Sequence, residues 1–248
     1  MSVILPPEMM DKILDNIPTG KEGRRTLITC ALVATWWTGP SQRRLFSSVQ
    51  VYMSNYNRFV NNVLADPKTH LLGFIRSLTY SHRRDYRVQD LEREHGESFS
   101  ALCNLHSLTL HFIRLEHIGG GRFPTCFSTF RKTLTYLSLH AFTTSFSAFV
   151  TLAGYFPNIT TLSLDLFMLR PDEVPVPQLS QPLRGKLRVC EVESDCLEFF
   201  DRFAELDLEY EELLLDSSRV DVTFMERVLR VSTSTVKFLR FARGLQRE

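Results

Sequence analysis

The sequence has 248 residues and a formal charge of +1, from 29 basic and 28 acidic side chains. It contains no concentrated run of Lys and Arg, so neither nucleic acid nor a membrane surface is expected as a partner. The five cysteines are irregularly spaced, and no stretch approaches the roughly 18 apolar residues of a membrane span. We therefore expect a cytoplasmic or nuclear location and no disulfide framework.

The first segment is typical of a short amphipathic helix. Pro6 and Pro7 suit a first helical turn, where a missing N–H costs little, and Glu8 lies favourably near the positive end of the helix dipole. Apolar residues then follow at one- and three-residue steps on one face: Met9, Met10, Ile13, Leu14 and Ile17. The turn residues Pro18-Thr19-Gly20 are expected to end this helix.

A second helix is predicted from about Arg24 to Thr35, with an apolar stripe that includes Leu27 and Cys30. Leu32 and Val33 lie off this stripe and widen the apolar surface beyond what one buried face needs. Trp36 and Trp37 follow, and Gly39-Pro40 is expected to end one helix and begin a third. Three helices in under fifty residues form a thin core, so we expect a partner protein to cover the surplus.

In their order and spacing, these residues resemble an F-box. Leu5-Pro6-x-Glu8, Ile13-Leu14 and Leu32-Val33, with Trp37 four residues later, carry the resemblance. The letters from Cys30 to Val33 and from Arg43 to Phe46 look like the variant common in fungal F-box proteins. The match covers about 42 residues, roughly a sixth of the chain. It implies docking on a Skp-type adaptor by Leu5, Pro6, Glu8, Ile13, Leu14, Leu32, Val33 and Trp37.

The rest of the chain repeats the pattern Leu-x-x-Leu-x-Leu, with substitutes. Its copies begin at Ile75, Leu105, Leu134, Ile159, Leu187, Tyr210 and Val236. Their middle residues are separated by 23 to 30 residues, close to the period of leucine-rich repeats. Each copy predicts a short strand whose inner face is buried only when neighbouring copies stack on it. The alternative is an ordinary α/β domain with coincidental leucine spacing.

Candidate outer helices lie between these strands. The stripe from Phe146 to Phe156 predicts one, and similar stripes lie near residues 196–204 and 221–229. Residues 55–64 predict a first outer helix, and residues 46–52 alternate as a capping strand would. The expected fold is α/β, with an F-box over residues 1–50. An irregular leucine-rich-repeat solenoid over residues 51–248 follows, with short parallel strands inside and helices outside.

No pattern in the sequence predicts an enzyme. The seven histidines lack a metal-ligand spacing, no nucleophile motif appears, and the triple glycine at residues 119–121 lacks the context of a phosphate loop, so no catalytic residue, metal or cofactor is expected. The basic segment His82–Arg87 is expected to be a surface loop, and recognition of a phosphorylated or acidic partner is its alternative role.

The resemblance implies a substrate-receptor subunit of an SCF-type ubiquitin ligase, which reaches a cullin through the adaptor and holds an unknown target protein on its repeats. One rival is a leucine-rich-repeat scaffold whose F-box-like segment is only a structural cap. An enzyme with a diverged site is a third, weaker alternative.

Overall fold

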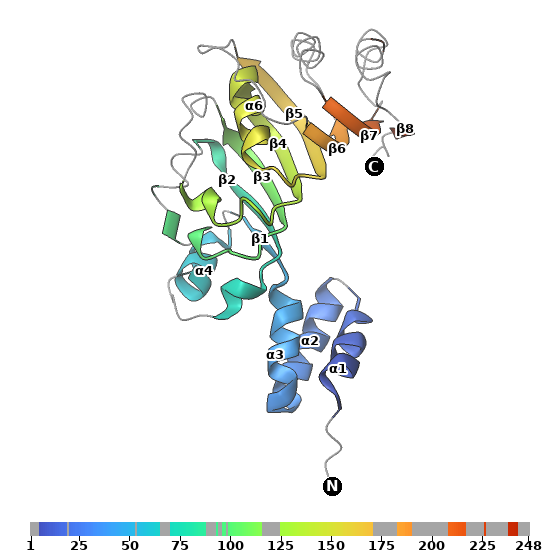
Figure 1. Cartoon of the computed structure of the whole chain (residues 1–248). Helices are drawn as coiled ribbons and strands as arrows, with labels where there is room; N and C mark the ends of the chain where they lie inside the picture. Colours follow the sequence, from blue (N-terminus) through green and yellow to red (C-terminus); the bar gives the residue numbers. More distant parts are fainter. Residues whose placement is uncertain are drawn as a thin grey trace, which may run out of the picture.

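The chain forms a bundle of three helices followed by a sheet with helices on one face (Figure 1). The computed structural model describes residues 5–18, 20–52, 54–64, 70–87, 93, 96–97, 99–115, 125–170, 183–189, 208–216, 226 and 238–242. The outer helices expected near residues 196–204 and 221–229 lie outside these ranges, apart from Glu226.

The bundle consists of α1 (Pro7–Asp15), α2 (Lys21–Val33) and α3 (Thr35–Phe46). Its small core contains Met10, Leu14 and Leu27, which are all buried. Two ion pairs link α3 to α1: Arg43 to Asp11 at 3.7 Å and Arg44 to Asp15 at 3.6 Å. These pairs are exposed, so they orient the helices more than they stabilise them.

The break between the second and third helices lies at Ala34, and the prediction of a break at Gly39-Pro40 is wrong. Ala34 has an extended backbone (φ −155°, ψ 147°), whereas Pro40 lies inside α3. A proline in a helix removes one backbone hydrogen bond, and here the packing of α3 against α2 outweighs that loss. The Thr38 hydroxyl also donates to the carbonyl oxygen of Ala31 at 3.0 Å, which satisfies an acceptor in the last turn of α2.

The described strands form one parallel sheet in chain order, from β1 to β8. They are β1 (Ser48–Val51), β2 (Ser77–Arg87), β3 (Ser107–Arg114), β4 (Tyr136–Ser145), β5 (Thr161–Arg170), β6 (Leu183–Val189), β7 (Leu208–Asp216) and β8 (Phe238–Ala242). The capping strand expected over residues 46–52 is therefore β1, at one edge of the sheet. The basic segment His82–Arg87 belongs to β2 and is not a loop.

The repeats of the sequence are aligned in register across the sheet. Leu108 pairs with Leu137, and Leu137 with Leu162, so equivalent leucines form one row. The fifth copy differs from the prediction, because Leu187 rather than Cys190 pairs with Leu162. The row thus runs through residues 78, 108, 137, 162, 187, 213 and 239. With Leu187 in the row, the fifth copy lies 25 residues after Leu162 and 26 residues before Leu213, so the spacing of the repeats is more even than predicted.

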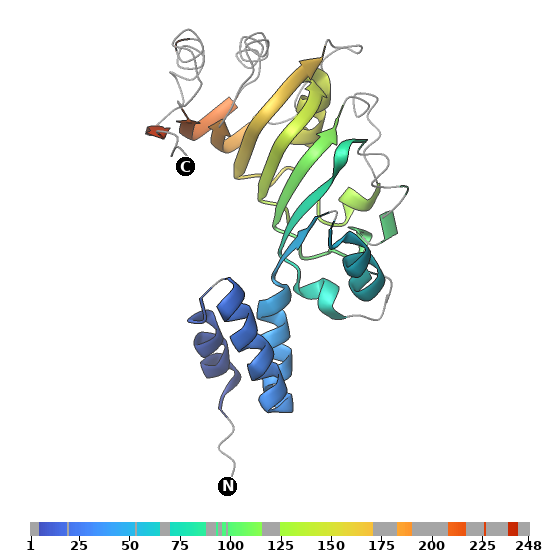
Figure 2. The same cartoon turned by 180° about the vertical axis from the view of Figure 1, so that it is seen from behind.

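The main core lies between the sheet and the helical segments on one of its faces (Figure 2). These segments are α4 (Tyr56–Phe59), the π-helix η1 (Val60–Leu64), the 3-10 turns η2 (His70–Phe74) and η4 (Thr125–Ser128), and α6 (Phe146–Tyr155). The prediction of a helix from the stripe at Phe146 is confirmed, and Ser145 caps it by accepting a hydrogen bond from the Ala148 N–H. The helix expected over residues 55–64 is present as α4 followed by η1.

A single residue, Ser47, connects α3 to β1. Its carbonyl oxygen accepts hydrogen bonds from the backbone N–H groups of Arg76 and Ser77, both at 2.9 Å, where β2 begins. The guanidinium carbon of Arg43 also lies 5.9 Å from the ring centre of Phe74 in η2. The bundle is therefore attached directly to the edge of the sheet, without a long linker.

Candidate interaction surfaces

The three helices expose large apolar side chains that a helical bundle normally buries. Their exposed fractions are 49% for Met9, 43% for Ile13, 50% for Ile28, 82% for Leu32, 73% for Val33 and 37% for Trp36. We call these six residues the exposed apolar set. Among the described residues, the only other large apolar side chain with comparable exposure is Tyr52, at 41%. Exposed apolar side chains gathered on one small unit are typical of a protein–protein contact.

Helical spacing explains why these side chains are exposed. Met9 and Ile13 are four residues apart on α1, and Ile28 and Leu32 are four residues apart on α2, so each pair shares a helix face. On α1, the neighbouring pair Met10 and Leu14 faces inward instead. The bundle thus buries one stripe of α1 and one of α2 and leaves a second apolar stripe of each helix uncovered.

The residues expected to dock on an adaptor occupy both exposed and interior positions. Pro6, Glu8, Ile13, Leu32 and Val33 are exposed. Leu5 and Trp37 are half-buried, and Leu14 is only 2% exposed, so Leu14 supports the bundle from within.

The sequence expectation that a partner protein covers the surplus rested on the paired tryptophans, the two methionines and Leu32-Val33. Met9 and Trp36 are exposed as that expectation requires, whereas Met10 is buried, and Ile28 was missed. Trp36 lies beside Trp37 with ring centres 5.3 Å apart. The four-residue spacing of Ile28 from Leu32 was the signal that could have found Ile28.

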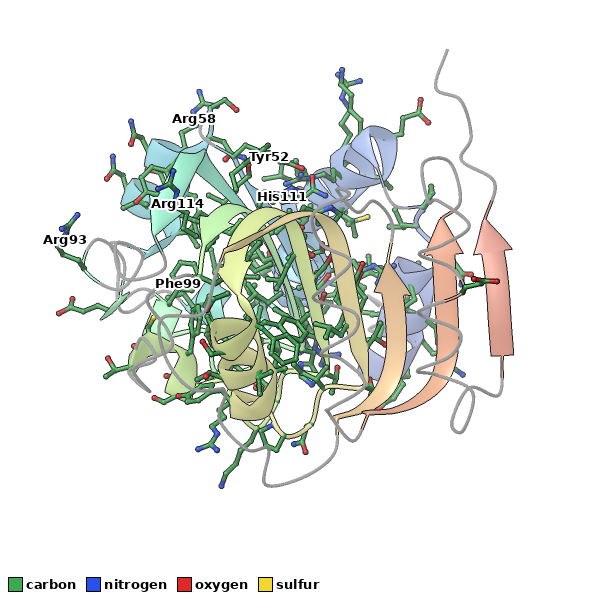
Figure 3. All side chains as sticks on the ribbon, turned by 90° about the horizontal axis from the view of Figure 1, so that it is seen from above. Tyr52, Arg58, Arg93, Phe99, His111 and Arg114 are labelled. Atoms are coloured by element: carbon green, nitrogen blue, oxygen red, sulfur yellow. The ribbon has the colours of Figure 1, made fainter. Side chains whose placement is uncertain are left out.

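The opposite face of the sheet from α6 carries small hydroxyl side chains, and we call it the open face. Its central row includes Thr79, Thr109, Ser138 and Ser163, which pair in register from β2 to β5. These residues alternate with the leucines of the main core, so their side chains point away from it. Thr79 and Thr109 are half-buried on this face, whereas Ser138 and Ser163 are only 1% and 2% exposed. In Figure 3, His111 lies on this face, whereas the buried Phe99 lies on the side of α6.

Two histidines stack on the open face. The rings of His111 and His140 lie 4.6 Å apart and nearly parallel, at 13°. Nε2 of His140 lies 3.0 Å from the Ser138 hydroxyl. Parallel stacked rings direct their nitrogen lone pairs side by side rather than at one point, so the pair does not form a metal site as arranged.

Groups that carry chemistry are dispersed over the described part of the chain. It contains no cluster of three or more His, Cys, Asp or Glu side chains that would hold a metal ion. Cys30 is half-buried, Cys103 is exposed and Cys126 is buried, so these thiols lie in different environments. Burial raises the pKa of Tyr155 above 10.0, an effect that the nearby Arg131 opposes.

No known protein-family model matches the chain, and no curated protein matches its sequence. Within the described residues, every helix is too short or too polar to cross a membrane.

Proposed function

We propose that the chain is a substrate-receptor subunit of an SCF-type cullin–RING ubiquitin ligase. Residues 1–50 would be the F-box that docks on a Skp-type adaptor, and the adaptor would connect the chain to a cullin. The observation that carries this proposal is the exposure of Leu32 and Val33, at 82% and 73%. Both residues belong to the part of the sequence that resembles an F-box.

The free energy of burial explains why this exposure points to a partner. Covering a Leu or Val side chain that is otherwise exposed contributes about 1.5–3 kcal/mol. Leu32, Val33 and Ile28 lie on one helix, so a partner groove that covers them together would gain several such contributions. Glu8, which is exposed on α1, would add an orienting charge to the contact.

The same exposure argues against the scaffold alternative, in which the bundle only caps the repeats. A cap would turn its surplus apolar residues toward the first strand. The bundle instead contacts the sheet through the C-terminal end of α3, by way of Ser47 and Arg43. Leu32 and Val33, at the C-terminal end of α2, remain uncovered.

The arrangement of the strands supports the proposal that residues 51–248 form an irregular leucine-rich-repeat solenoid. Its strands are parallel, follow chain order and pair equivalent leucines. We propose that the open face holds the target protein, because its central row is polar, with Thr79 and Thr109 partly exposed, while the other face is occupied by the core. The chain would then contribute proximity rather than chemistry, since ubiquitin transfer would occur on another subunit.

The test is co-expression with a Skp-type adaptor, followed by affinity purification. The wild type is expected to co-purify with the adaptor, and the double variant Leu32→Ser with Val33→Ser is expected to lose it. Tyr52→Ser is the control, because it removes an exposed ring, at 41%, outside the bundle. The proposal fails if the wild type does not co-purify, or if the double variant binds as well as the control.

A further inference from the structure

A pocket of about 370 Å³ lies where the bundle meets the edge of the sheet. It is bounded by the turn between α1 and α2, by one side of α2 and α3, and by β1. Its volume falls at the lower end of the range of small-molecule sites, about 300–1,000 Å³. None of its lining residues belongs to the exposed apolar set, or to Thr79, Thr109, Ser138 and Ser163 of the open face.

The walls of the pocket separate into two chemical kinds. Apolar surface comes from Ile17 in the turn after α1, Leu27 in α2 and Leu45 in α3. Arg24 and Arg44 line the same space from α2 and α3. Among the described residues that form the walls, none is Asp or Glu. The pocket walls therefore combine apolar side chains with two arginines and no acidic side chain among the described residues.

The charge balance around each arginine favours an incoming anion. Arg44 is paired with Asp15 at 3.6 Å, but Asp15 is largely exposed and lies outside the pocket walls. Such an exposed pair contributes little, so an anion can share or replace it. Arg24 has no ion pair with a described acidic residue. Hydroxyl and amide groups of Ser48 and Gln50 from β1 offer further hydrogen bonds.

We propose that this pocket binds a small organic anion, with a phosphate or carboxylate head between Arg24 and Arg44 and a short aliphatic tail against Leu27 and Leu45. A guanidinium matches the geometry of both head groups. Because the pocket is separate from the exposed apolar set, this binding does not depend on the proposed adaptor contact.

Isothermal titration of the full chain tests the proposal with three probes: hexyl phosphate, inorganic phosphate and 1-hexanol. Hexyl phosphate is expected to bind more tightly than the other two, because only it carries both head and tail. Arg24→Gln is expected to weaken hexyl phosphate binding by about tenfold, as for one lost hydrogen bond to a charged group. Arg24→Lys keeps the charge but loses the planar guanidinium, so its loss of affinity is expected to be smaller than that of Arg24→Gln.

Arg25→Gln is the matched control, because Arg25 is the exposed neighbour of Arg24 on α2 and does not line the pocket. Thermal melting of each variant checks that it is folded. The proposal is overturned if hexyl phosphate does not bind at millimolar concentration, or if Arg24→Gln and Arg25→Gln bind it equally well. It is also overturned if either simpler probe binds as tightly as hexyl phosphate.

Discussion

Leu27 and Leu32 lie on the same helix, five positions apart, and have opposite environments. Leu27 is 6% exposed in the core of the bundle, whereas Leu32 is 82% exposed. Five positions correspond to a rotation well past one helical turn, so the two side chains point in different directions. One leucine therefore serves the fold, and the other is available to a partner.

Alanine substitution of these two leucines should separate stability from binding. Leu27→Ala is expected to lower the free energy of unfolding by about 2–5 kcal/mol, because it removes buried methyl groups. Leu32→Ala is expected to change it by less than about 0.5 kcal/mol, as at other exposed sites. Urea denaturation measures both values. Equal effects on stability would mean that Leu32 is buried in the folded chain.

Adding a methyl group at Gly23 should disrupt the turn between α1 and α2. A Cβ atom at Gly23 would lie 1.7 Å from the carbonyl oxygen of Pro18, which is far inside contact distance. Gly23→Ala is therefore expected to lower the melting temperature strongly. Gly39→Ala is the control, since nothing lies within 4 Å of its added Cβ in α3.

The control carries two opposing effects. Alanine is favoured over glycine inside a helix by roughly 0.5–1 kcal/mol, but the Cδ atom of Pro40 crowds the Cβ of a helical residue that precedes it, so Gly39→Ala should change the melting temperature much less than Gly23→Ala. Calorimetry of both variants beside the wild type makes the comparison. If Gly23→Ala melted like Gly39→Ala, the close approach at Pro18 would not exist in solution.

Tyr155 should make stability fall in alkaline solution. Its pKa is raised by burial, so the unfolded chain releases this proton first as the pH passes 10.0, while the folded chain still holds it. The folded state then binds more protons, and the free energy of unfolding decreases as the pH rises through this window. The contribution is fully present below pH 10.0.

Tyr155→Phe isolates this effect, because other tyrosines also titrate in alkaline solution. The variant keeps the ring that Arg131 covers, with the guanidinium carbon 4.9 Å from the ring centre. It also keeps the backbone carbonyl that accepts from Nε of Arg131 at 2.8 Å. The expected result is a smaller loss of stability than in the wild type between pH 9 and pH 11 by urea denaturation, starting near the ordinary tyrosine pKa of about 10. Parallel curves for the two proteins would contradict the assignment.

The corrected register of the fifth repeat makes a prediction about Leu187. This residue belongs to the row of Leu162, Leu137 and Leu108, which are buried, whereas Arg188 belongs to the row of Ser163. A charge in the leucine row is expected to be far more costly than one in the serine row. Leu187→Asp should therefore destabilise the chain much more than Arg188→Asp in urea denaturation. If Arg188→Asp destabilised the chain more than Leu187→Asp, the register with Leu187 in the leucine row would be wrong.

Local periodicity was enough to predict much of the secondary structure. The stripe at Phe146, Phe149 and Ala153 predicted α6, because a one-sided apolar pattern with a period near 3.6 has few other stable solutions. Alternation around Leu108, Leu137 and Leu162 predicted parallel strands in register, because a shift by one residue would turn the leucines away from the core. The fifth copy went wrong because Leu187-x-Val189 and Cys190-x-Val192 fit the same pattern, and only pairing with β5 separates them.

The sequence by itself determined that the first fifty residues carry more apolar side chains than a three-helix core can bury. It placed Leu32 and Val33 off the buried stripe of α2, but it could not decide which apolar residues of α1 stay outside, because they were predicted to lie on one face. The tertiary structure decided this by packing Met10 and Leu14 inward, which left Met9 and Ile13 exposed. It also brought Arg24 and Arg44 from separate helices to one pocket. Such choices depend on contacts between distant segments, and no local pattern records them.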